Sequence, residues 1–471
     1  MPLPPFLQFQ NRISRRGLAP SSVPQVNPMK HSMRAAVALL AVMAWQSPLQ
    51  AQTTQSSLHA PEKVGGVEPG AVGGVGLALI SKKVVLAEFR GRDVINNGVV
   101  LIKDGKIQAV GTRAKIVIPA EYHVLDVGDR WLIPGLVEMH NHVAGRFGLN
   151  DMVYLANPGL RASADVEPGN HLTRMGLAGG VTSVLYIPGS GTNVGGQGVL
   201  LRTGFNTYER CEIRNPGSLK LAQAGNPERW LMRPGRTLMN YNTRATFKKG
   251  IAYAKTWEAF ERDGGIKPRV NPQWEIFRHL RKREVHISTH TQMYQVVMMT
   301  ITLVHDELGL PFFIDHGTFD TWRLAGEAEK REIFGVLGPR NVDPPNQGMI
   351  RWTGSSPERM QGVAAGYQGN GFTRIGFNTD SPVIPQEELQ LQAAIAVRYG
   401  LNDAEMVSLR GLTIIPAMAG GIGDSVGSIE VGKDADILIT TGSITNPQHS
   451  VEMIFQLGEV VYNPLEEGRR W

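Results

Sequence analysis

The pattern of apolar and polar positions divides the sequence into two β-rich ends around a mixed middle. Between residues 76 and 133, runs such as "GLALISKKVVLAEF" and "NGVVLIKDGKIQAVG" predict short strands separated by tight turns. The pair Asp104-Gly105 between two such runs predicts a β-hairpin. Residues 421–465 contain "GSIEVGKDADILIT" and "VEMIFQLGEVVYN", which have the same character. We therefore expect both ends to build one small composite β-sandwich domain.

The middle, residues 134–420, alternates short apolar runs with segments that have helical spacing. "GVTSVLYIPG" and "PFFIDHG" are typical of buried strands, whereas "ATFKKGIAYAKTWEAFERDGG" and "PQEELQLQAAIAVRYG" are typical of helices. Alternating strands and helices over this length predict an α/β fold, a TIM-like (β/α)8 barrel. The seventh strand is weak, because only "EIFGVLG" stands out before the stretch 339–373. The sequence does not predict which residues of that stretch contact a substrate.

Residues 1–51 read as a leader, followed by a glycine-rich linker at 52–75. From Met29 the leader has a basic start, an apolar run from Ala35 to Trp45 and a cleavage position after Ala51, the layout of a signal peptide. The run is shorter than the roughly 20 residues that a membrane-spanning helix needs. The alternative is a hydrophobic N-terminal helix of the fold. We expect an exported chain, periplasmic or secreted, without a stable membrane anchor after cleavage.

Charge and cysteine content narrow the classes of partner. The chain has 48 basic and 42 acidic residues among 471, a net charge of +6. The leader holds five basic and no acidic residues, so 43 basic and 42 acidic residues remain without it. No basic patch survives, which argues against nucleic acid as a partner. Cys211 is the single cysteine, so the mature chain has no internal disulfide.

Candidate ligands for a metal ion stand at the ends of the apolar runs in the middle of the chain. They are His140 and His142 after "LIPGLVEM", Lys220 in "SLKLAQAG", His290 in "EVHISTH", His316 in "PFFIDHG" and Asp380 in "RIGFNTDSP". In a barrel the carboxyl ends of the strands face one another, so these residues are expected to converge. Histidines with a carboxylate suit a metal such as zinc, which activates water. A single histidine of this kind is more often structural.

Three motifs occur in an order that resembles the amidohydrolase superfamily. They are "IPGLVEMHNH", "FNTDSP" and "GSIEVGKDADILI", and the resemblance covers about residues 75–465. It is nearest to the imidazolonepropionase-like and Xaa-Pro dipeptidase-like branch. The resemblance implies that His140 and His142 bind metal from strand 1, and His290 and His316 from strands 5 and 6. It further implies that Asp380, from strand 8, binds or adjoins the metal and acts as general base.

Lys220 is placed in the site by the resemblance of "SLKLAQAG" to the strand-4 motif "IKIxxxG" of that family. In its two-metal branch, this lysine is carboxylated and bridges the ions. The resemblance therefore implies a divalent metal, by preference zinc, with one ion per chain or two if Lys220 is carboxylated. The alternative is a lysine that reaches out of an edge strand. Glu138 and His286 are weaker candidates for supporting roles, and residues 188–198 are interpreted as an active-site loop.

The function implied by the resemblance is hydrolysis of carbon-nitrogen bonds through a metal-activated water. Cyclic amides or small dipeptide-like amides are the expected substrates. One alternative is an Xaa-Pro-type dipeptidase. Another is a non-catalytic scaffold for binding, but such a scaffold is expected to lose ligands, and here every expected position is filled. The sequence leaves open the substrate, the number of metal ions and whether the chain forms a homo-oligomer.

Overall fold

The structure is a computed structural model that describes residues 75–91, 94–146, 149–229, 233–339, 341–345 and 357–468. The leader and nearly all of the linker lie outside the described residues, so the signal peptide and export stay predictions. Among the described residues, no helix is long and apolar enough to cross a membrane. All of these residues belong to one unit, Pro61–Trp471.

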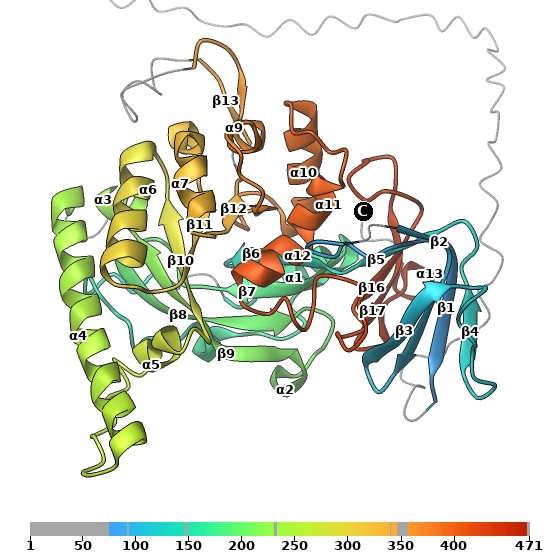
Figure 1. The fold of residues 1–471 in the computed structure, drawn as a ribbon, viewed down its shortest axis with the longest axis horizontal. Coiled ribbons are helices and arrows are strands. Elements are labelled where there is room, and N and C mark those ends of the chain that lie inside the picture. The colour runs from blue at the N-terminus through green and yellow to red at the C-terminus, as the bar shows by residue number, and fades with distance from the viewer. Residues whose placement is uncertain are drawn as a thin grey trace, which may run out of the picture. The chain divides into compact units, whose positions relative to one another are not determined.

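Eight strands, paired in chain order, form a sheet that nearly closes into a barrel (Figure 1). They are β6 (Leu136–Asn141), β7 (Val181–Tyr186), β8 (Val194–Arg202), β9 (Glu212–Ala222), β10 (His286–Thr291), β11 (Phe312–His316), β12 (Gly335–Leu337) and β15 (Ile375–Phe377). β6 and the chain after β15 meet where the His142 amide donates to the Ser381 carbonyl. The expected TIM-like barrel is present, and its weak seventh strand is β12, within "EIFGVLG".

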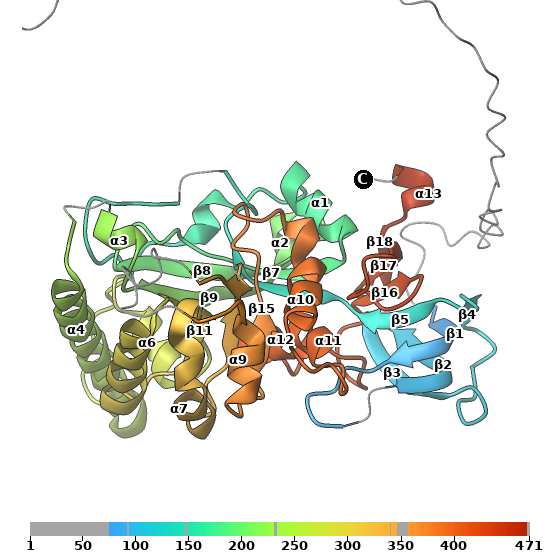
Figure 2. The same cartoon turned by 90° about the horizontal axis from the view of Figure 1, so that it is seen from above.

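One strand departs from the parallel arrangement of a (β/α)8 barrel. β8 pairs antiparallel with both β7 and β9, whereas the other neighbouring pairs are parallel. The cause is the connection 187–193, which is shorter than the dozen or so residues that a parallel crossover needs. β8 therefore turns back beside β7, and the three strands lie side by side in Figure 2. The expectation of eight parallel strands is wrong at this position.

Helices stand along the outside of the barrel strands (Figures 1 and 2). They are α1 (His171–Ala178), α2 (Tyr208–Cys211), α3 (Asn226–Arg229), α4 (Arg236–Asp263), α5 (Ile276–Arg281), α6 (Tyr294–Thr300), α7 (Ala325–Lys330), α9 (Val363–Gly369), α10 (Leu389–Arg398), α11 (Val407–Leu412) and α12 (Ile414–Ala419). α4 and α10 confirm the two helical segments that the spacing predicts. Buried Phe247, Ala254 and Trp257 recur along one face of α4. The Phe247 ring packs 5.3 Å from Phe277 of α5.

Strands from both ends of the described chain share a second sheet. They are β1 (Leu77–Val85), β2 (Val94–Lys103), β3 (Lys106–Thr112), β4 (His123–Asp126), β5 (Trp131–Pro134), β16 (Ile437–Thr440), β17 (Val451–Gln456) and β18 (Glu459–Tyr462), followed by α13 (Pro464–Glu467). The Asp104-Gly105 hairpin is confirmed, because both residues have positive φ, 50° and 74°, as the turn requires. A short third sheet joins β13 (Val342–Asp343) and β14 (Gln361–Gly362). The division into domains stays an interpretation.

Polar contacts join the second sheet to the barrel. The Gln456 amide on β17 donates to the Thr182 carbonyl on β7, at 2.7 Å. Asp434 accepts from Arg202 of β8 at 2.7 Å and from Lys106 of β3 at 2.6 Å. The Asp434 side chain is almost fully buried, so the two cations compensate a charge that water does not reach.

Candidate metal centre

The side chains predicted from the sequence converge at one end of the barrel. His140 lies on β6 and His142 just after it, Lys220 lies on β9, His290 on β10, His316 ends β11, and Asp380 follows β15. These strands are the first, fourth, fifth, sixth and eighth of the barrel, as expected. Because β9, β10 and β11 run parallel in register, their carboxyl ends present these residues to one another. Their role as metal ligands stays a prediction.

The donor atoms of the cluster are within contact distance. His140 Nε2 lies 3.1 Å from His142 Nε2 and 3.1 Å from Asp380 Oδ1. His142 Nε2 is 3.5 Å from the same Asp380 oxygen. His316 Nε2 lies 2.8 Å from His290 Nδ1. One ligand atom each of His140, His316 and Asp380 all fall within 4.8 Å of one another.

Backbone carbonyls fix the orientation of His142 and His316. His142 Nδ1 donates to the Ile187 carbonyl at 2.8 Å, and His316 Nδ1 donates to the Gly338 carbonyl at 2.8 Å. A carbonyl oxygen accepts only, so Nδ1 carries the proton and Nε2 of the neutral ring carries a lone pair. Burial lowers the pKa of both rings, that of His316 to about 4, so both are neutral at pH 7. Both Nε2 lone pairs therefore face the cluster.

His140 lies between two carboxylates. Its Nδ1 donates to Asp315 Oδ2 at 2.6 Å, while Nε2 faces Asp380. Burial alone lowers the pKa of His140, but the Asp315 charge and then Asp380 outweigh burial and raise that pKa to about 9. Burial acts to raise the pKa of Asp380, but the His140 charge and hydrogen bonds from His140 and His142 hold it well below its usual range. The two aspartates therefore keep their charge at neutral pH.

This donor set fits a divalent metal ion. The Nε2 atoms of His140 and His142 are 3.1 Å apart, and both are acceptors when the rings are neutral. Such lone pairs repel unless a cation or a proton lies among them. Here the protonated His140 supplies that positive charge, and metal binding has to release this proton. Neutral imidazoles with a carboxylate match the ligands that zinc prefers.

Two members of the cluster face its open side. The side chains of His142 and Asp380 are 18% and 19% exposed, whereas that of His140 is 1% exposed. A water molecule or substrate can therefore reach Asp380, which is the position that a general base needs.

Lys220 points into the barrel, and the alternative of a lysine reaching out of an edge strand is wrong. The whole residue is buried, and Nζ lies 3.3 Å from His140 Nε2 and 3.9 Å from Asp315 Oδ2. Burial lowers the pKa of the Lys220 amine, although the two nearby aspartates oppose this. Only a neutral amine reacts with carbon dioxide, and a lowered pKa increases the neutral fraction of the lysine. The position of Lys220 therefore suits the predicted carboxylation.

The weaker candidates have supporting positions. Glu138 accepts the backbone amides of His140 and Thr379, so it fixes the chain on either side of the site and does not touch the imidazole ring. Burial raises the pKa of Glu138 to about 7. His286 bonds the Ala419 carbonyl and lies outside the donor cluster. In the segment 188–198, the Ser190 hydroxyl contacts His290 Nδ1 at 2.8 Å, but the segment from Val194 onward is strand β8 and not loop.

Sequence reasoning missed Asp315, which precedes His316 directly. In a regular strand, successive side chains point to opposite faces. A metal ligand at His316 therefore predicts that the side chain of Asp315 points away from the site. The backbone of His316, however, has φ of +71°, in the left-handed region that residues other than glycine rarely adopt. This conformation breaks the alternation and brings both side chains to the cluster. Asp380 has φ of +49°, and such backbone is typical of functional sites.

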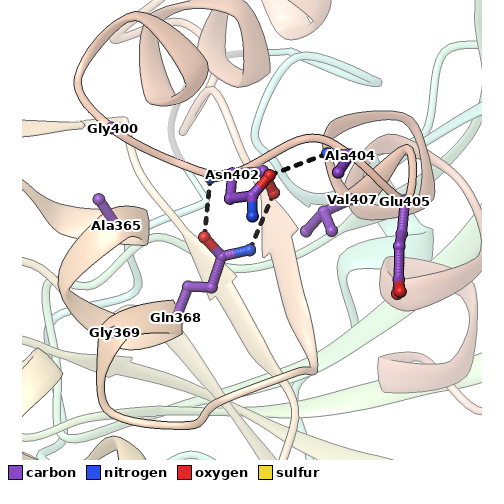
Figure 3. A pocket seen from close by; sticks show the side chains of 8 residues that line it. All are labelled: Ala365, Gln368, Gly369, Gly400, Asn402, Ala404, Glu405 and Val407. Atoms are coloured by element: carbon purple, nitrogen blue, oxygen red, sulfur yellow. Dashed lines mark hydrogen bonds between the residues drawn. The ribbon is translucent and has the colours of Figure 1, made fainter.

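A pocket elsewhere on the barrel contains none of these residues. It measures about 420 Å³ and lies between α9 and the segment that joins α10 to α11 (Figure 3). Gln368 and Asn402 pair across it, because the Gln368 amide donates to the Asn402 carbonyl at 2.9 Å and accepts the Asn402 amide at 2.8 Å. The two residues therefore bond each other, and the pocket lacks a cluster of metal-binding side chains like the one at the barrel strand ends.

The structure thus combines a nearly closed barrel with histidines and carboxylates at its strand ends. The model of the Amidohydrolase family matches residues 370–462, which include Asp380. The structure is similar to that of an amidohydrolase from Thermotoga maritima MSB8, with a TM-score of 0.70 and 27% identity, covering 82% of this chain and 100% of that one.

Curated relatives are similar to parts of the chain. The amidohydrolase tasK of Hapsidospora irregularis is 25% identical over 388 residues, 73% of this chain, but the match covers only 37% of that relative's length. A dihydroorotase of Anaeromyxobacter dehalogenans is 34% identical over 89 residues, 19% of this chain and 17% of the relative. Residues 370–462 therefore match the Amidohydrolase family, and most of the described chain has the fold of an amidohydrolase, in agreement with the resemblance of its sequence motifs.

Proposed function

We propose that the chain hydrolyses a carbon-nitrogen bond in a cyclic amide or a small dipeptide-like amide. The observation that supports this most is the fixed orientation of the rings. Carbonyl acceptors hold Nε2 of His142 and His316 toward the cluster, and Asp315 does the same for His140. Side chains that only stabilise a strand end have no need for three converging Nε2 atoms.

A divalent metal, by preference zinc, would be held by the donor atoms of His140, His142, His290, His316 and Asp380. When bound, such an ion makes water a stronger nucleophile and polarises the carbonyl under attack. Lys220 lies close enough to His140 to take part, and a second ion depends on its carboxylation. One or two ions per chain remain open in this proposal.

Asp380 is the general base. Its carboxylate is ionised at neutral pH and reaches the open side of the cluster. It accepts a proton from the attacking water as the oxygen bonds to the carbonyl carbon, and it then donates that proton to the leaving nitrogen. The carbon-nitrogen bond breaks as this proton arrives, which gives a carboxylic acid and an amine, and the acid then passes its own proton to the amine to leave a carboxylate and an ammonium ion.

The test is hydrolysis of a panel of cyclic amides and Xaa-Pro dipeptides before and after metal removal. Chelation should abolish activity, and zinc should restore it. His142→Asn should lose activity, whereas His279→Asn should keep it, because His279 is an exposed histidine paired with Glu284. Full turnover by a protein shown to be free of metal would contradict the proposal. Turnover of the dipeptides alone would favour the dipeptidase alternative.

A further inference from the structure

We propose that Asp315 is a positioning residue that aims His140 at the metal, an inference that rests on the proposed function. Asp315 is fully buried on β11. Its carboxylate faces polar groups from four other parts of the barrel: His140 at 2.6 Å on β6, Lys220 at 3.9 Å on β9, Ser288 at 2.9 Å on β10 and Asn378 at 3.4 Å just after β15. A buried carboxylate with this many donors is held in one orientation.

The position of Asp315 separates it from the ligands themselves. It contacts Nδ1 of His140, on the opposite side of the ring from Nε2, which faces Asp380. The group of atoms that could share an ion contains His140, His316 and Asp380. Asp315 therefore acts on a metal through the imidazole ring of His140.

The charge of Asp315 distinguishes its effect from that of the other ring partners. His142 and His316 donate to neutral carbonyls, whereas His140 donates to an ionised carboxylate. A carboxylate accepts only, so it fixes the Nδ1-protonated form of His140 and leaves Nε2 free to bind metal. It also makes Nε2 a more basic ligand than a carbonyl partner does. Among these three rings, His140 should therefore contribute most to metal affinity.

The experiment compares metal affinity in Asp315→Asn and in a matched control, by competition of zinc or cobalt with a chromogenic chelator. Asn keeps the shape and one acceptor but loses the charge. Loss of such a supporting partner weakens metal affinity about 10- to 100-fold, and we expect a loss of this size. Asp320→Asn is the control, because Asp320 is also buried but accepts the Tyr294 amide and pairs with Arg323. Its metal affinity should not change.

A double-mutant cycle tests whether Asp315 acts through His140. In a His140→Gln background, Asp315→Asn should cause no further loss of metal affinity. An equal loss in both backgrounds would overturn the inference, as would wild-type affinity in Asp315→Asn. If wild-type protein binds no metal at all, the proposed function fails instead.

If Asp315→Asn does not fold, the wild-type protein still provides a test. Nitrogen-15 spectra of the histidine-labelled, zinc-loaded chain report which ring nitrogen carries the proton, and His140→Gln identifies the signal. Protonation at Nδ1 of His140 supports the inference. Protonation at Nε2 would overturn it.

Discussion

Replacing Asp436 by asparagine should stabilise the protein at neutral pH. Asp436 is buried where the composite sheet meets the barrel, and its carboxylate accepts the Leu457 amide at 2.9 Å and the Gln456 amide at 3.3 Å. Burial raises the pKa of Asp436 from 3.8 to about 6, although the Leu457 hydrogen bond and Arg202 oppose the rise. The folded protein therefore disfavours the ionised form.

The size and sign of the effect follow from this pKa. Between about pH 4 and pH 6 the folded chain holds a proton that the unfolded chain has released, so stability falls as pH rises through this window. The rise of the Asp436 pKa from 3.8 to about 6 corresponds to about 3 kcal/mol of lost stability above pH 6. Asparagine carries no charge and so avoids this cost. It no longer accepts the hydrogen bond from Gln456, which contributes about 1 kcal/mol. We expect Asp436→Asn to gain about 2 kcal/mol near pH 7.5 and to lose about 1 kcal/mol near pH 4.

Urea unfolding of the wild type and Asp436→Asn at a series of pH values measures this directly. Asp434→Asn is the matched control, because Asp434 is also buried but pairs with Lys106 and Arg202. Asp434→Asn removes the charge from both pairs and should lower the free energy of unfolding at neutral pH by about 1.5–3 kcal/mol, an effect of opposite sign to that of Asp436→Asn. A difference between Asp436→Asn and wild type that stays constant with pH, or that is largest near pH 4, would refute the reasoning.

Three further changes test the site. Lys220→Ala should lower the number of bound ions, from about two per chain to about one if Lys220 is carboxylated, and an unchanged count in elemental analysis would remove Lys220 from the centre. Asp380→Asn should keep its circular dichroism spectrum and lose about 10²- to 10⁴-fold in kcat, so a fully active variant would exclude it as general base. At Gly338, where φ is +135°, an added Cβ would lie 2.4 Å from the Asn378 carbonyl oxygen. Gly338→Ala should therefore displace the acceptor of His316 and cost about 1–3 kcal/mol, and an unchanged thermal midpoint would contradict this.

Much of the barrel could be predicted because hydrophobic pattern and position in the strand are local signals. Apolar runs that each end in a polar residue predicted that His140, Lys220 and His316 lie at strand ends, and the family resemblance assigned them to particular strands of the barrel. The Asp104-Gly105 hairpin followed from residues that tolerate positive φ. The convergence of the site residues could be predicted because the carboxyl ends of barrel strands meet in one place.

Other features depend on geometry that the pattern does not contain. The direction of β8 is set by the length of one connection, and an apolar strand has the same pattern in either direction. Asp315 was not predicted, because the positive φ of His316 breaks the alternation of side chains that a regular strand has. The partners of the rings, such as the Ile187 and Gly338 carbonyls, are backbone groups that every residue provides. Their positions become evident only in the folded chain.

The most direct test of the central claim is an anomalous difference map from crystals of the protein grown with zinc, measured on both sides of the zinc absorption edge. The proposed function predicts a peak among the donor atoms of His140, His142, His290, His316 and Asp380, with a second peak beside Lys220 if that residue is carboxylated. A zinc peak elsewhere and none at this cluster would contradict it.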